Sequence, residues 1–162
     1  MRIALAADHA GAALKAELIA RLVPLGHELI DLGGDGSNLD DDYPDYSRAL
    51  GLAILEGRAD RGILVCGSGV GASVAASKVP GIRAGLCHDT YSAAQGVRHD
   101  DMNVLALGAR VIGIETAVSC AESFIAARFS GAARHVRRVG KIRAIEQEAA
   151  LLAAVKPINP DR

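Results

Sequence analysis

The chain has 162 residues and a formal net charge of −1, so it carries no general electrostatic attraction to nucleic acid or to an anionic membrane surface. This length predicts a single domain. Because tryptophan is absent and aromatic residues make up only 3%, aliphatic side chains and alanine must fill its core. The three cysteines show no Cys-x-x-Cys spacing, and no apolar run is long enough for a secretory signal or a membrane span. We therefore expect a reduced, cytoplasmic protein that binds neither nucleic acid nor a membrane.

Short apolar runs alternate with amphipathic helical patterns along the chain. The runs that predict strands are residues 2–7, 28–32, 62–66, 83–87 and 103–107. Helices are expected at about residues 10–25, 43–56, 72–78, 90–97 and 114–125. This alternation predicts a doubly wound, Rossmann-like α/β fold: a five-stranded parallel sheet inside an αβα sandwich. We expect the strand order 2-1-3-4-5, with the topological switch point between the first and third strands, which places Asp8 beside Cys66.

The chain changes character after Gly131. Its basic residues there are Arg134, Arg137, Arg138, Lys141 and Arg143, and an apolar seam follows at Ile142, Ile145, Ala149 and Leu152. We expect an extra C-terminal helix whose seam packs on a partner chain. Arg134 and Arg138 lie one helical turn apart and could clamp a phosphate, or simply form a solvated basic face. The expected organisation is a domain over residues 1–148, with a helix end and flexible tail over 149–162.

The most informative stretch is residues 62–73, which read GILVCGSGVGAS. A buried strand ends there at Cys66 and is followed by a glycine-rich loop and a helix. Glycines let backbone N–H groups turn toward one point, and a helix N-terminus adds partial positive charge. Since ligands of parallel sheets bind beyond the carboxyl ends of the strands, we predict a thiol beside an anion-binding loop. Such surroundings favour the thiolate form of a cysteine. Cys87 and Cys120 lack this setting and are expected to be structural.

The glycine loop also admits other interpretations. Residues 67–72 fit the dinucleotide fingerprint G-x-G-x-x-A, but they lie in the third βα turn, and one small domain leaves little room for a second substrate. A cysteine phosphatase would need an arginine six residues after the cysteine, where this chain has Ala72. The scarcity of aromatic residues disfavours a flavin. Because no metal-ligand spacing is present, we expect neither a metal nor any other cofactor.

Three further polar features accompany this loop. His9 and Arg110 stand at predicted βα turns, where ligand-binding groups collect. His99 precedes a predicted strand and could be either a functional residue or a solvated loop histidine. The aspartates within residues 35–42 are expected to form only a polar loop. Sequence patterns alone therefore leave the roles of these residues open.

Five segments together resemble one family. They are Ala7-Asp8-His9-Ala10-Gly11, Asp42-Tyr43-Pro44, residues 66–71, residues 103–110 and Arg134-His135-Val136-Arg137-Arg138. In this order they resemble the sugar-phosphate isomerase family that comprises ribose-5-phosphate isomerases of type B and galactose-6-phosphate and allose-6-phosphate isomerases. The resemblance extends over about residues 1–148, and its specificity comes from the combination.

The resemblance implies a doubly wound fold, a homodimer or dimer of dimers with active sites shared at the dimer interface, and no metal. It implies that Cys66 is the base that moves a proton between C1 and C2, and that His99 assists ring opening as a proton donor. The groups that would hold the enediolate oxygens are Ser68 and the amides of Gly67, Gly69, Val70 and Gly71. The residues that would bind phosphate are His9, Arg134 and Arg138, with Arg110 contributing, and Asp8 and Tyr43 would contact the sugar.

The expected activity is the interconversion of ribose 5-phosphate and ribulose 5-phosphate in pentose phosphate metabolism. The alternatives are isomerisation of erythrulose 4-phosphate, allose 6-phosphate or galactose 6-phosphate, or a non-catalytic module that binds phosphate or a nucleotide. The chain departs from the family pattern at two positions. Ser68 replaces a frequent threonine and keeps the hydroxyl. Asp100 replaces the usual asparagine, and its carboxylate would repel a nearby phosphate, point elsewhere or select a different substrate.

Overall fold

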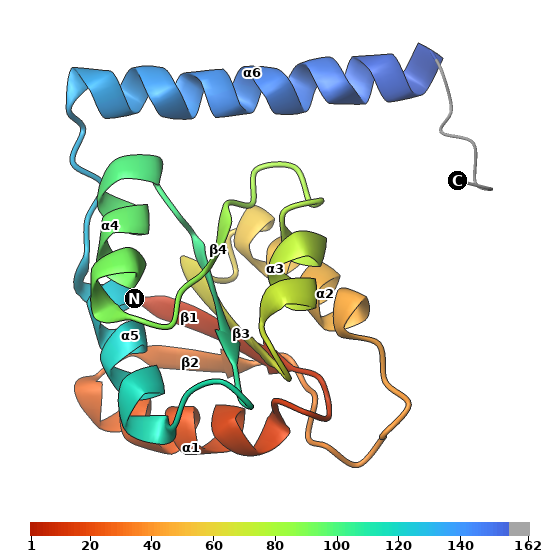
Figure 1. The fold of residues 1–162 in the computed structure, drawn as a ribbon, viewed down its shortest axis with the longest axis vertical. Helices are drawn as coiled ribbons and strands as arrows, with labels where there is room; N and C mark the ends of the chain where they lie inside the picture. The colour runs from red at the N-terminus through yellow and green to blue at the C-terminus, as the bar shows by residue number, and fades with distance from the viewer. Residues whose placement is uncertain (156–162) are drawn as a thin grey trace. The chain divides into compact units, whose positions relative to one another are not determined.

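The computed structural model describes residues 1–155, whose fold is drawn in Figure 1. Its strands are β1 (Arg2–Ala7), β2 (Glu28–Asp31), β3 (Arg61–Cys66), β4 (Ala84–Leu86) and β5 (Val104–Gly108). Its helices are α1 (Ala12–Leu22), the 3₁₀ turn η1 (Val23–Leu25), α2 (Tyr43–Leu55), α3 (Val70–Ala76), α4 (Thr90–Asp100), α5 (Ile114–Ala126) and α6 (Ala133–Val155). Met1–Phe129 form one compact unit, and among the described residues 130–155 form a second, which contains α6.

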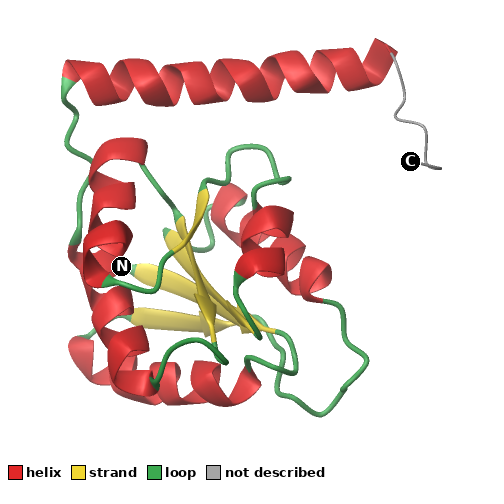
Figure 2. Cartoon of the chain, in the orientation of Figure 1, coloured by secondary structure: helices red, strands yellow, loops and turns green. Residues whose placement is uncertain are grey.

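The first unit is a parallel sheet between two helical layers, as Figure 2 shows. Alternate side chains of a strand point to opposite faces, so each buried strand contributes to two cores. Ile3 and Leu5 pack in the cluster that includes side chains of α1, α4 and α5. Ala4 and Cys66 pack in the cluster formed with α2 and α3. The predicted αβα sandwich is therefore confirmed, and Cys66 belongs to the face that α2 and α3 cover.

The predicted strand order is wrong at one edge of the sheet. The observed order is β2-β1-β3-β5-β4, so the fifth strand, not the fourth, pairs with β3. All five residues of β5 are buried, whereas β4 has only three residues, none of which is fully buried. A strand that is apolar on both faces gains most from neighbours on both sides, and a short strand is suited to an edge. The predicted neighbour relation of β1 and β3 is confirmed.

Helix α4 continues three residues beyond its predicted end at Val97. Asp89 starts the helix by accepting a hydrogen bond from the backbone N–H of Ser92 (2.7 Å). Asp101 ends it in a left-handed conformation (φ 53°), and Arg83 holds that residue through an ion pair at 2.7 Å. This contact from the neighbouring strand segment has no local sequence signal. His99 is consequently a residue of the last helical turn and not a loop histidine.

The second unit contains α6, a helix of 23 residues that runs through the expected boundary at residue 148. Its apolar residues Ile142, Ile145 and Leu152 are exposed within the single chain, and the packing of this seam on a partner chain stays a prediction. Residues 149–155 form the end of this helix, where a helix end was expected, and residues 156–162 lie outside the described part of the chain, so the expected flexible tail stays a prediction. Among the helices of residues 1–155, none has the length and hydrophobicity needed to cross a membrane.

A close approach of two backbones positions the start of α1 against β3. Gly11, the N-cap of α1, has no room for a side chain, because a Cβ atom there would lie 2.3 Å from the carbonyl oxygen of Val65. The Gly11 backbone N–H donates to the carboxylate of Asp8 at 3.0 Å. The glycine therefore holds the turn that follows β1 directly against the end of β3.

We predict that Gly11→Ala lowers the free energy of unfolding by about 2–3 kcal/mol, because the new methyl group collides with backbone that cannot move aside. Gly113→Ala is the matched control, since Gly113 is also a helix N-cap with negative φ but a Cβ atom there meets no atom within 4 Å. That control should cost less than about 1 kcal/mol. Urea denaturation of both variants measures the difference, and equal losses would contradict the steric argument.

Candidate active site

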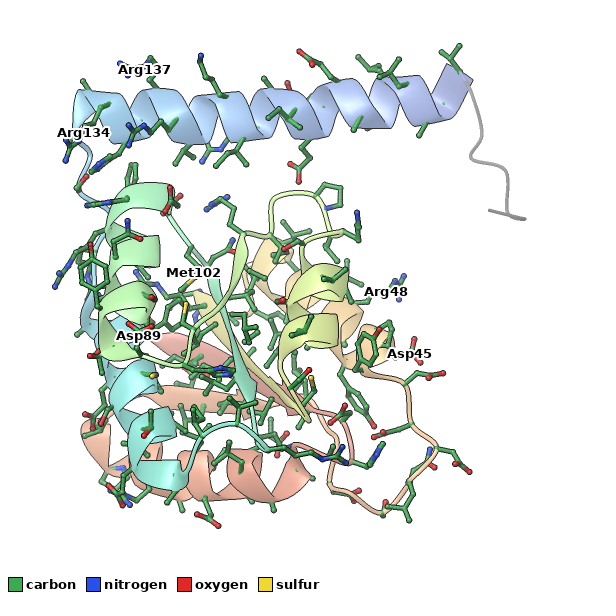
Figure 3. All side chains as sticks on the ribbon, viewed as in Figure 1. Asp45, Arg48, Asp89, Met102, Arg134 and Arg137 are labelled. Atoms are coloured by element: carbon green, nitrogen blue, oxygen red, sulfur yellow. The ribbon has the colours of Figure 1, made fainter. Side chains whose placement is uncertain are left out.

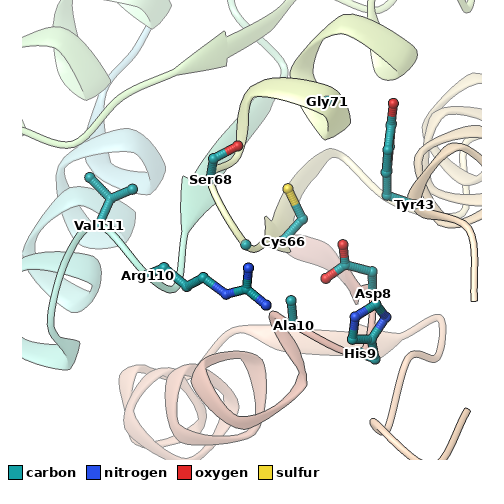
Figure 4. Close-up of a pocket in the computed structure, with 10 residues that line it drawn as sticks. Asp8, His9, Ala10, Tyr43, Cys66, Ser68, Gly71, Arg110 and Val111 are labelled. Atoms are coloured by element: carbon teal, nitrogen blue, oxygen red, sulfur yellow. The ribbon is translucent and has the colours of Figure 1, made fainter. Parts of the chain in front are cut away.

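A pocket of about 380 Å³ opens at the carboxyl ends of β1 and β3, where the switch-point rule places ligands. The residues that line it are Asp8, His9, Ala10, Tyr43, Cys66, Gly67, Ser68, Gly71, Arg110 and Val111. Figure 4 shows these side chains around the opening. They come from the turns after β1 and β5, from the last residue of β3 with the loop and first turn of α3 that follow it, and from the first residue of α2. Eight of these ten lining residues were predicted from the sequence as site residues, all but Ala10 and Val111.

The thiol of Cys66 sits at the end of β3 and is 4% exposed. The backbone N–H of Gly69 donates to its sulfur at 3.0 Å, an interaction that stabilises negative charge on the sulfur. Gly69 has a φ of +81°, and a Cβ atom there would lie 2.5 Å from Leu86 and 2.9 Å from the backbone of Leu107. Glycine is therefore required at position 69 for the loop to turn its amide back onto the thiol.

The aromatic ring of Tyr43 lines the pocket beside the glycine loop. A Cβ atom at Gly71 would lie only 2.7 Å from the Tyr43 ring, so ring and loop are in direct contact. The buried hydroxyl of Ser47 lies 2.9 Å from the carbonyl oxygen of Tyr43 and 3.3 Å from that of Ala72, which ties α2 to α3. Sequence reasoning missed Ser47, because its role depends on a contact between two helices.

Asp8 and Arg110 bring opposite charges to the pocket. Asp8 follows β1 and is 8% exposed. Figure 4 shows its carboxylate and the Arg110 guanidinium reaching the pocket from different sides. The backbone N–H of Arg110 donates to the carbonyl oxygen of Gly67 at 2.9 Å, so the turn after β5 is fastened to the glycine loop. His88 supports the same turn by accepting the N–H of Gly108 at 3.0 Å. The predicted proximity of Asp8 to Cys66 is confirmed, since both line this pocket.

The loop of aspartates does more than the sequence analysis expected. Asp41 reaches the pocket residue His9 and accepts from its ring nitrogen Nδ1 at 2.6 Å and from its backbone N–H at 3.1 Å. Burial alone would raise the pKa of the Asp41 carboxyl, but hydrogen bonds from His9 and from Tyr46 outweigh it and lower that pKa. The hydrogen bond to Asp41 in turn raises the pKa of Tyr46. The expectation of an unspecialised polar loop is therefore wrong at Asp41.

Two predicted site residues lie away from the pocket within the first unit. His99 is in the last turn of α4, where its Nδ1 contacts Gln95 Nε2 at 2.9 Å. Asp100 lines a separate cavity with residues that include Arg83 and Met102. Neither residue lines the pocket that contains Cys66.

The two predicted phosphate-binding arginines belong to the second unit. Arg134 and Arg138 lie one turn apart on α6, as their spacing predicted. Arg134 donates from Nε to the ring of His135 at 3.0 Å. Figure 3 shows Arg134 and its neighbour Arg137 on this helix. In the part of the chain that the structure describes, no group of three or more histidine, cysteine, aspartate or glutamate side chains could hold a metal ion.

These features define a class of protein: a doubly wound α/β protein with a thiol and a glycine-rich amide loop at its switch point. Residues 3–142 match the sequence model of the family described as Ribose/Galactose Isomerase. The chain belongs to this ribose/galactose isomerase family, as the sequence resemblance predicted.

Individual relatives agree with that assignment. The chain is 47% identical over 146 residues to the ribose-5-phosphate isomerase B of Escherichia coli, covering 90% of this chain and 97% of the relative. It is 40% identical over 142 residues to the D-erythrulose-4-phosphate isomerase of Pectobacterium atrosepticum, covering 86% and 93%. A crystal structure of Mycoplasma genitalium ribose-5-phosphate isomerase B with bound ribulose-5-phosphate superposes with a TM-score of 0.85 at 36% identity, covering 91% and 97%.

Proposed function

We propose that this protein interconverts ribose 5-phosphate and ribulose 5-phosphate through an enediolate, as a step of pentose phosphate metabolism. The observation that carries the proposal is the Cys66 thiol at the glycine loop, in a chain 47% identical to a ribose-5-phosphate isomerase B. An aldose–ketose isomerase needs a base beside an acidic C–H bond and donors beside the developing oxyanion. The thiol and the loop amides supply these two requirements from one strand end.

In the proposed mechanism the thiolate of Cys66 removes the proton from C2 of the open-chain aldose. The electron pair moves into a C1–C2 double bond, and negative charge develops on the oxygen of C1. Donors of the loop stabilise this charge: the amides of Gly67, Val70 and Gly71 and the hydroxyl of Ser68. The amide of Gly69, which the sequence resemblance also assigned to this role, donates to the sulfur of Cys66 and stabilises the thiolate instead. The C1 oxygen gains a proton as the C2 hydroxyl loses one. Cys66 then returns its proton to C1, which completes the ketose without any net change in protons or electrons.

The proposed substrate contacts divide between sugar and phosphate. Asp8 and Tyr43 contact the sugar hydroxyls, for which the Asp8 carboxylate is an acceptor. His9 and the guanidinium groups of Arg134 and Arg138 bind the phosphate, with Arg110 contributing. Arginine suits this task because its planar fork of donors matches the oxygens of a phosphate.

We further propose that the protein acts in the cytoplasm as a homodimer, or a dimer of dimers, whose active sites are shared between subunits. Within one chain, His99 does not line the pocket that contains Cys66. His99 of a second copy would then be the proton donor for ring opening at this chain's pocket. The exposed apolar residues of α6 supply a surface that a partner subunit can bury.

A panel of sugar phosphates tests the substrate. We expect kcat/KM to be highest for ribose 5-phosphate among tetrose, pentose and hexose phosphates, measured by following the ketose product. The second candidate is isomerisation of erythrulose 4-phosphate, which one relative at 40% identity favours. Allose 6-phosphate and galactose 6-phosphate are longer sugars and would need a larger pocket than ribose 5-phosphate. If one of them is the preferred substrate, Asp100 would be the residue that selects it. Binding of nucleotides without turnover of any sugar would indicate a non-catalytic module instead.

Mixing of two inactive variants tests the shared site. Cys66→Ala should lower turnover by about 10²–10⁴, the usual contribution of a general base, and His99→Ala should also be impaired. When the two chains are refolded together, half of the dimers are mixed and each mixed dimer has one intact site, so about one quarter of wild-type activity should return.

The control mixture is Cys66→Ala with Asp8→Ala. Both of these residues line the same pocket of one chain, so every site in a mixed dimer would still carry one defect. This mixture should recover no activity. Failure of the Cys66→Ala and His99→Ala mixture to recover activity would mean that both residues serve a site within one chain.

Single substitutions on α6 test the phosphate assignment. Arg134→Ala or Arg138→Ala should weaken binding of substrate and of inorganic phosphate by about 1.5–3 kcal/mol, the contribution of a charge-assisted contact. Arg137→Ala is the matched control because it removes the same charge from the same helix. Isothermal titration calorimetry with inorganic phosphate provides the measurement. Equal losses of phosphate affinity in all three variants would contradict the assignment, because they would show that only the net charge of the helix matters.

A further inference from the structure

The contact between His9 and Asp41 joins two segments that lie 32 residues apart in the chain. One oxygen of Asp41 accepts both the Nδ1–H of the His9 ring, at 2.6 Å, and the His9 backbone N–H, at 3.1 Å. The Asp41 side chain is only 6% exposed, whereas that of His9 is 32% exposed and lines the pocket. The carboxylate is thus buried behind a histidine that a ligand can reach.

The chemistry of the carboxylate decides which ring nitrogen carries a proton. An ionised carboxylate only accepts hydrogen bonds, so Nδ1 of His9 must be protonated wherever this contact is made. Hydrogen bonds from His9 and Tyr46 keep Asp41 ionised, because they stabilise its charged form. The nitrogen that Asp41 does not hold, Nε2, is then the one available to a ligand in the pocket.

We propose that Asp41 is a positioning residue, which holds the His9 ring with Nδ1 protonated and Nε2 directed to the phosphate of the substrate. This inference rests on the proposed function, in which His9 binds that phosphate. Phosphate oxygens accept hydrogen bonds, so Nε2 must donate one, and with Nδ1 also protonated the ring carries a positive charge. The buried carboxylate compensates that charge from behind, as the carboxylate does for histidines in catalytic dyads and metal sites.

The arrangement also accounts for the path of the loop of residues 35–42. Asp41 is the residue just before the N-cap of α2, and α2 begins with the pocket residue Tyr43. One carboxylate therefore links the turn after β1 to the start of α2. If Asp41 only held these two segments together, the backbone N–H of His9 would be enough for that task. Its effect on phosphate binding would then not depend on the His9 imidazole.

A double-mutant cycle separates the two roles. Asp41→Asn should raise KM, and the dissociation constant of inorganic phosphate, by about tenfold, while kcat falls by a smaller factor. In a His9→Ala background the same substitution should have no further effect on phosphate binding, because Asp41 acts through the ring. Asp40→Asn is the matched control. It removes the charge of the neighbouring residue, whose backbone N–H donates to the side chain of Asn38 and not to His9. An undiminished effect of Asp41→Asn without the His9 ring would overturn the proposal.

Nitrogen-15 NMR of the His9 ring provides a readout that needs no turnover. In the unliganded wild-type protein, the shifts should show a protonated Nδ1, and the neutral ring should carry its proton there. In Asp41→Ala the neutral ring should move toward the Nε2–H form, which an imidazole without a partner prefers. A wild-type neutral ring with its proton on Nε2 would refute the assignment outright.

These measurements also separate the inference from the proposed function. Inorganic phosphate is the probe for binding, so the cycle can be completed by calorimetry even if no sugar phosphate is isomerised. Absence of isomerase activity with the expected cycle and tautomer would overturn the proposed reaction and keep the His9–Asp41 pair as a phosphate-binding device. Normal isomerase activity with no coupling between Asp41 and His9 would support the proposed reaction and overturn the positioning role of Asp41.

Discussion

The parallel pairing of β1 with β3 is the constraint on which the candidate site depends. Five residue pairs join these strands, and the pairing continues beyond the sheet where the N–H of Asp8 donates to the carbonyl oxygen of Val65 at 3.3 Å. Since parallel strands end at the same edge, the residues after them become neighbours whatever their distance in the chain. Gly11 allows the following helix to begin at this edge without separating the two strands.

The turn after β5, which also contributes to the site, is placed by the parallel pairing of β5 with β3. β5 lies beside β3 with Cys66 opposite Gly108. Backbone N–H groups of Ala109 and Arg110 then donate to the carbonyl oxygens of Cys66 and Gly67, both at 2.9 Å. The backbone at the end of β3 is therefore held by both neighbouring strand ends: Asp8 donates to Val65, and Ala109 donates to Cys66. Main-chain bonds set this geometry, so the side chains around the pocket can differ while the position of the thiol stays fixed.

The sequence predicted what depends on local pattern and failed where a distant contact decides. Apolar runs and glycine turns predicted the parallel sheet and the glycine loop after Cys66, and the family resemblance added other residues that line the pocket, such as Tyr43. The positions of β4 and β5 were exchanged because strand order depends on which strand can be buried on both sides, a property of the assembled sheet. The end of α4 depends on Arg83 holding Asp101, and the role of Asp41 depends on His9. Neither pair has a spacing that a sequence pattern reveals.

The absence of tryptophan gives the site its own optical signal. With excitation that phenylalanine does not absorb, ultraviolet emission from this chain comes from its three tyrosines. Tyr43 forms a wall of the pocket, and Tyr46 shares a hydrogen bond with Asp41, while Tyr91 is 75% exposed. Two of the three fluorophores thus lie at the pocket or one hydrogen-bonded residue behind it. Because the core is built from aliphatic residues, tyrosine fluorescence reports mainly on the pocket, with Tyr91 as a constant exposed background.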